Sequence, residues 1–119
     1  MEILNYWAMP GIDHRSEFDE DYAQALIVTA EHVFGVDDLR ARTRRREVCE
    51  LRQLCIYILR QRTRLTTTAI GRIFALDHAS VTHSAQMAER LLEVDRAYQR
   101  RYKWFVDRSA MEVEEGIKN

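Results

Sequence analysis

Residues 66–94 read TTTAIGRIFALDHASVTHSAQMAERLLEV and hold two helical patterns joined by a short turn. Apolar residues recur at intervals of three and four, first at Ala69, Ile70, Ile73 and Phe74 and then at Val81, Ala85, Ala88, Leu91 and Leu92. Thr66 or Thr67 can cap the first helix and Asp77 the second, with only Ala75 and Leu76 between them. This arrangement predicts a helix-turn-helix.

Helical spacing also precedes this unit. A first helix is predicted from an N-cap at Ser16 or Asp19 to Gly35, because glycine suits the residue that follows a helix. We expect Asp37 to cap a short helical turn, and a central helix to span residues 45–61.

A last helix is predicted from about Arg96, and no segment alternates with the period of a strand. The expected fold is all-α, a compact bundle of five or six helices containing the helix-turn-helix. Gly71 interrupts a short helix, so we expect another helix to cross closely there. The expected organisation is an N-terminal arm at 1–15, one domain at 16–108 and an acidic tail at 109–119 that frays.

Charge is distributed unevenly along the chain. The net charge is −1 overall, but −8 over residues 1–39, +9 over residues 40–108 and −2 over residues 109–119. A basic body between acidic ends suits a polyanionic partner.

Several other classes of protein are disfavoured. Apolar stretches fall short of the roughly 20 residues of a transmembrane helix, and the N-terminus lacks signal-peptide features, so we expect a cytoplasmic, nucleoid-associated protein without a membrane partner. Cys49 and Cys55, six apart on one helix, would point about 240° apart, which excludes a disulfide between them. No metal-ligand spacing, catalytic constellation or cofactor loop is recognisable, so we expect no metal, no cofactor and no enzyme.

The second helix of a helix-turn-helix can present its first residues to the major groove of DNA. In this chain those residues are His78, Ala79, Ser80, Thr82 and His83. Imidazole and hydroxyl groups can bond to bases or phosphates, and a methyl group can meet the methyl of thymine. The pattern therefore predicts binding to double-stranded DNA.

An arginine-rich run adds to this prediction. Residues 40–64 hold nine arginines against two acids, and the run itself contains Arg42, Arg44, Arg45 and Arg46. Arginine suits bidentate phosphate or minor-groove contact better than lysine does. We therefore expect this run to bind the DNA backbone.

Several short segments match one known family. They are Val33-Phe34, Val36-Asp37-Asp38-Leu39, Arg44, Arg46, Val48, Leu51-Arg52-Gln53, Leu59, Thr63, Ile70-Gly71, Phe74 and Asp77-His78-Ala79-Ser80-Val81-Thr82-His83. Over residues 25–105 the chain resembles the C-terminal DNA-binding domain of the bacterial replication initiator DnaA, of the Trp-repressor-like helical group.

The resemblance implies that Arg44 enters the minor groove, and that Asp77, His78 and Ser80 read or position the major groove. It implies supporting contacts to phosphates or bases from Arg46, Arg52, Gln53 and His83, and Thr67 completes the expected set. No Gly-x-x-x-x-Gly-Lys-Ser/Thr loop is present, so a freestanding module without ATPase is expected. Its role could lie in replication, in transcription control or in a mobile element.

The alternative is an adaptor that keeps the fold but binds another protein. The near-zero net charge favours it, as do Leu76, where the family usually has Arg, and Ala79, which replaces a hydroxyl residue. A homodimer or a protein partner could use the acidic first helix or the last helix.

Overall fold

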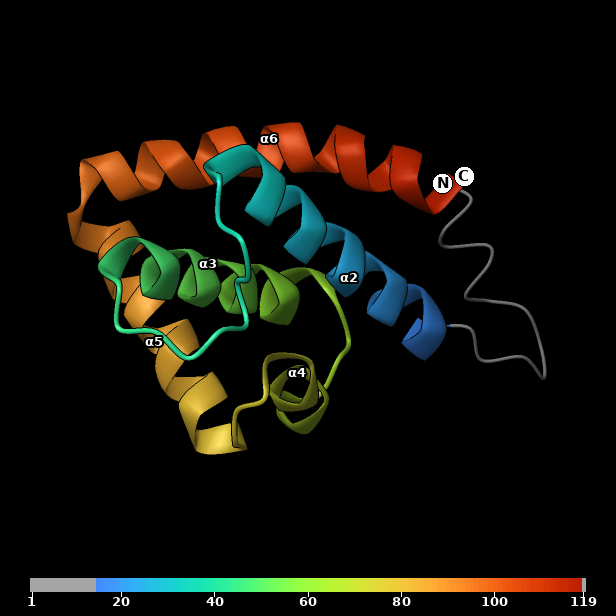
Figure 1. The fold of residues 1–119 in the computed structure, drawn as a ribbon, viewed down its shortest axis with the longest axis horizontal. Coiled ribbons are helices and arrows are strands. Elements are labelled where there is room, and N and C mark those ends of the chain that lie inside the picture. The colour runs from blue at the N-terminus through green and yellow to red at the C-terminus, as the bar shows by residue number, and fades with distance from the viewer. Residues whose placement is uncertain (1–14, 119) are drawn as a thin grey trace.

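The computed structural model describes residues 15–118, with side chains for residues 18–108. Over this range the regular elements are helices (Figure 1). They are α2 (Arg15–Phe34), α3 (Arg46–Arg62), α4 (Thr67–Phe74), α5 (His78–Val94) and α6 (Arg96–Lys118). The predicted all-α bundle with a helix-turn-helix is confirmed.

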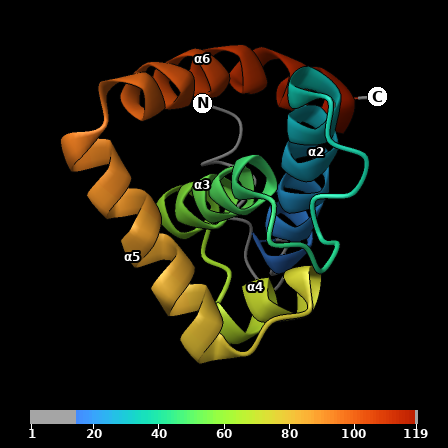
Figure 2. The ribbon, with the colours of Figure 1, turned by 60° about the vertical axis from the view of Figure 1, so that its left-hand side comes forward.

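Helix α3 runs through the middle of the bundle. Helices α2 and α5 flank α3, α6 runs along the top of the bundle in both views, and α4 lies at the bottom (Figures 1 and 2). The buried residues of α3 are Val48, Leu51, Leu54, Cys55, Ile56, Ile58 and Leu59. A helix with so many buried positions needs cover on several sides, and the neighbouring helices provide it. The helix-turn-helix therefore rests on a packed core.

Local side chains set the ends of the two short helices. The Oγ1 of Thr66 accepts the backbone N–H of Ala69 at 3.0 Å, which caps α4. An Oδ1 of Asp77 accepts the N–H of Ser80 at 2.7 Å, which caps α5. Both caps follow the sequence prediction, and together they bound the turn.

Gly71 makes the tight turn between α4 and α5 possible. Its carbonyl accepts the N–H of Leu76 at 2.8 Å, and a Cβ on Gly71 would collide with the carbonyl oxygen of Leu76. The close crossing predicted at Gly71 is therefore made mainly by the backbone of the turn rather than by another helix. Ala75 ends α4 in the left-handed conformation, with φ 57°.

The first helix begins before both of its predicted caps. Asp19 lies inside α2, is 1% exposed and accepts the backbone N–H of Arg64 at 2.9 Å. Asp19, one of the two expected N-caps, thus does not cap α2 but makes a tertiary contact between α2 and the segment before α4. At its other end α2 stops as predicted, since Gly35 has φ 67°.

Two further expectations about local structure are wrong. Residues 37–41 form a turn rather than a helix, and Asp38 organises it, because its Oδ1 accepts the N–H of Arg40 at 3.0 Å. The backbone of α6 is helical through Lys118, where a fraying tail was expected. The predicted arm lies outside the described residues apart from Arg15, and the domain boundaries remain a prediction.

Candidate nucleic-acid interface

The first turn of α5 is open to solvent. His78, Ala79 and His83 are exposed, while Ser80 and Thr82 are partly buried. The hydroxyl of Thr82 donates to the carbonyl of His78 at 3.1 Å. The surface that the sequence predicted for base contact is therefore not covered by described neighbours.

Asp77 caps the helix that presents this surface. The N–H of Ser80 that it accepts lowers the pKa of its carboxyl group below the ordinary value. The carboxylate therefore stays ionised at neutral pH, where it complements the positive end of the α5 dipole. By capping α5, Asp77 positions His78 and Ala79.

The loop between α2 and α3 presents its arginines outward. Leu39 is buried and Ala41 and Thr43 are partly buried, whereas Arg40, Arg42 and Arg44 between them are exposed. We call residues 36–45 the basic loop. Over residues 39–44 of this loop, alternating burial leaves every second side chain, an arginine, facing solvent.

Arg52 holds the basic loop in this conformation. From α3, its Nε donates to the carbonyl of Leu39 at 2.9 Å and its Nη2 to that of Ala41 at 2.6 Å. From α2, an Oε2 of Glu31 accepts the N–H of Leu39 at 2.8 Å. Arg52, predicted as a supporting DNA contact, has its guanidinium engaged here with main-chain carbonyls.

The two cysteines are free, and one of them also touches the basic loop. The thiol of Cys49 donates to the carbonyl of Thr43 at 3.3 Å, whereas Cys55 is fully buried, which raises its pKa far above the ordinary range. Cys55 is therefore unreactive, because a buried thiol with a raised pKa stays protonated. Cys49, through its bond to Thr43, adds one more contact that holds the basic loop.

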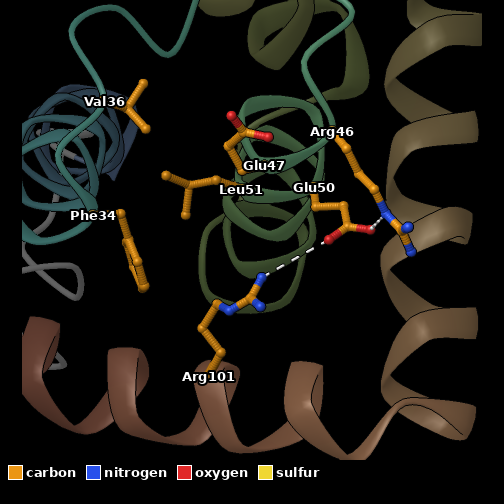
Figure 3. A pocket seen from close by; sticks show the side chains of 7 residues that line it. All are labelled: Phe34, Val36, Arg46, Glu47, Glu50, Leu51 and Arg101. Carbon is orange, nitrogen blue, oxygen red and sulfur yellow. Dashed lines mark hydrogen bonds and ion pairs between the residues drawn. The ribbon is translucent and has the colours of Figure 1, made fainter.

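Arg45, which precedes α3, and Arg46, its first residue, have protein partners. Arg45 donates to Glu47 and Arg46 to Glu50, each from Nε at 2.9 Å. Glu50 also lies 3.9 Å from Nη1 of Arg101 on α6, beside a hollow of about 250 Å³ with an apolar wall (Figure 3). The pair between Arg45 and Glu47 is exposed on both sides and therefore contributes little, whereas the Glu50 side chain is partly buried.

The guanidinium groups of Arg42 and Arg44 make no hydrogen bond or ion pair with another described residue. Gln53 on α3 and Thr67 at the start of α4 are partly buried, and their side chains likewise have no hydrogen-bond partner among residues 18–108. Within the arginine run, Arg42 and Arg44 are thus the side chains most available to an external anion.

The basic loop also reaches α4. Arg40 lines a hollow together with Ala69, Arg72 and Ile73 of α4. Arg40 and Arg72 were not among the site residues predicted from the sequence. The signal was available, because Arg40 belongs to the arginine-rich stretch and helical spacing puts Arg72 on the face of α4 opposite Ile70 and Phe74. The loop and the helix-turn-helix are therefore neighbours.

No helix within the described residues is long and apolar enough to span a membrane. Residues 18–108 also contain no cluster of three or more side chains from His, Cys, Asp and Glu that could hold a metal ion.

Comparison with known proteins identifies the family. The family described as "Bacterial dnaA protein helix-turn-helix" matches residues 25–87. The chain is 36% identical over 78 residues to the chromosomal replication initiator protein DnaA of Trichormus variabilis, covering 65% of this chain and 17% of that protein. It is 34% identical over 86 residues to the protein of the same name from Thermus thermophilus, covering 70% of this chain and 20% of that protein.

The similarity is confined to one part of these relatives, since the chain spans a fifth or less of their length. The matched region contains α3, α4, the second half of α2 and the first part of α5, and so includes both the basic loop and the turn. The resemblance expected from the sequence is confirmed: the chain belongs to the family of bacterial DnaA helix-turn-helix domains.

Proposed function

We propose that this chain binds double-stranded DNA with sequence preference. The first turn of α5 would contact base edges in the major groove, and Arg42 of the basic loop would bind the adjoining backbone. The observation that carries the proposal is the exposed start of α5, with His78 and Ala79 held outward behind the Asp77 cap. Arg44 would take the minor-groove position that the family resemblance implies.

A role in chromosomal replication is favoured over a role in transcription, because the relatives are named chromosomal replication initiator proteins. The structure supports positioning roles for Asp77 and Arg52, and supporting contacts for Arg45, Arg46, Gln53, Thr67, Ser80, Thr82 and His83. The chain would act as a recognition module and not as an enzyme.

Selection of duplexes from a random pool, followed by fluorescence anisotropy on selected and random duplexes across a salt series, tests this function. Arg44→Ala should weaken binding to both kinds of duplex, because the minor groove loses a cation that lies close to the phosphates. His78→Ala should alter preference by about 1–3 kcal/mol at particular base pairs. Arg100→Ala, an exposed arginine on α6, is the matched control and should match the parent.

The adaptor alternative makes a different forecast. An adaptor would show negligible binding to any duplex even at low salt, and that result would overturn the proposed function. Equal affinities and equal preferences for Arg44→Ala, His78→Ala and the parent would reject the assigned surface while leaving DNA binding itself intact.

A further inference from the structure

A hollow of about 410 Å³ lies where the basic loop meets α4. Arg40 and Arg72 both line it and both are exposed. Neither guanidinium makes a hydrogen bond or ion pair with another residue in the described part of the chain, unlike those of Arg45 and Arg46. Two arginines from separate elements thus border one hollow with their charges unsatisfied.

Two carboxylates border the same hollow. Glu20 and Asp21 are exposed residues of α2 and line it with Gln24. No ion pair of 4.0 Å or less joins either carboxylate to either arginine within residues 18–108. At such a site the carboxylates lower the positive potential without occupying the donors of the arginines.

We propose that Arg40 and Arg72 form a second anchor for the DNA backbone, on the α4 side of the basic loop, and that Glu20 and Asp21 reduce its affinity. This inference rests on the proposed function. When the second helix of a helix-turn-helix enters the major groove, the first helix crosses the phosphate backbone. Arg72 stands on the outward face of that first helix, and Arg40 extends the anchor into the loop.

The occupant of this anchor is a phosphate group of the same duplex that α5 reads. Charge complementarity supports this assignment, because the arginines present guanidinium donors without protein partners and phosphate accepts such donors bidentately. The anchor carries no base readout, since it contacts the backbone alone. It therefore contributes to affinity and to salt dependence without altering sequence preference.

The dependence of binding on salt tests the arginines. In anisotropy titrations of the whole chain, Arg40→Ala and Arg72→Ala should each reduce the slope of log K against log salt by about 1, because each removes about one phosphate contact. The loss of affinity should be equal on selected and random duplexes. Arg100→Ala on α6 is the control, and thermal unfolding would check that each variant is folded.

The carboxylates are tested by removing their charge. The double variant Glu20→Gln, Asp21→Asn should bind DNA more tightly than the parent at low salt, with the gain fading as salt screens the charges. In a background that carries Arg40→Ala and Arg72→Ala, the gain should shrink, because the cations that the carboxylates oppose are gone. A gain of equal size in both backgrounds would contradict the coupling.

The two proposals fail in distinguishable ways. A parent that binds no duplex overturns both of them. A parent that binds DNA, with unchanged salt slopes for Arg40→Ala and Arg72→Ala, overturns only the second anchor. A variant of Arg72 that changes base preference instead of salt slope would also reject a backbone contact.

Discussion

Ala75 shows how the turn tolerates an unfavourable backbone conformation. A residue other than glycine costs about 1–2 kcal/mol in the left-handed region, and the exposed methyl of Ala75 gains little packing in return. We expect Ala75→Gly to stabilise the chain by about 0.5–1 kcal/mol, after the larger backbone entropy of unfolded glycine is subtracted. Urea unfolding would measure the change. Ala79→Gly, in the first turn of α5, should instead destabilise it.

Asp19 is a buried carboxylate whose burial raises its pKa, despite the opposing hydrogen bond from Arg64. With the pKa raised in the folded state, its contribution to stability is fully present below the unfolded value of about 4 and is lost as pH rises through the folded value. In Asp19→Asn the amide oxygen can still accept the Arg64 N–H, without a charge.

We therefore expect the unfolding free energy of Asp19→Asn, relative to that of the parent, to increase as pH rises from about 4 to 7. Urea titrations at several pH values would measure it. The opposite result, a free energy of unfolding that rises with pH for the parent relative to the variant, would contradict this prediction. It would show that the hydrogen bond outweighs burial and that the folded state favours the ionised form of Asp19.

The basic loop shows how one side chain sets the conformation of a segment. Arg52 contacts two carbonyls with its planar fork, and a lysine ammonium cannot reproduce that geometry. Arg52→Lys should weaken DNA binding but leave the salt slope unchanged, because the charge is kept while the loop loosens. Amide hydrogen exchange at Leu39 and Ala41 should become faster.

Unchanged exchange at these amides would show that other contacts, such as the one from Glu31, suffice to hold the loop. A reduced salt slope for the lysine variant would point to a different role for Arg52, namely direct phosphate contact. The two roles are thus separated by one charge-preserving substitution.

The stability of the whole bundle depends on the packing of α6 over α2. Phe105 of α6 is fully buried, and its ring centroid lies 5.4 Å from that of Phe34. Phe105→Ala should lower the free energy of unfolding by about 3–5 kcal/mol. If the domain unfolds as one unit, protection at Val81 in α5 should fall with it, as hydrogen exchange would show. Trp104→Ala, at a side chain 49% exposed, should cost much less.

Local signals in the sequence were sufficient for most of the helical framework. Gly35 and Asp77 act at helix ends through contacts within a few residues, so their roles could be predicted. Asp19 and Arg52 could not be interpreted in the same way, because their partners lie 45 and 13 residues away along the chain. The roles of these two residues therefore depend on the tertiary fold and not on residue type or local spacing.

In the candidate site, too, contacts between residues close in sequence could be predicted and contacts between distant residues could not. Arg46 and Glu50 are four residues apart on one helix, so their ion pair could have been predicted. The approach of Arg40 to Arg72 depends on the path of the basic loop to α4, which no spacing encodes. Which arginines remain available to DNA is therefore a property of the folded chain.

The bonds that Arg52, Glu31 and Cys49 make to the basic loop have a thermodynamic consequence. A segment already confined to one conformation gives up little freedom when it meets a ligand, so its ordering is completed during folding rather than at the encounter. If the basic loop binds DNA as proposed, it would do so as a preformed template, and less of its contact energy would be lost to immobilisation.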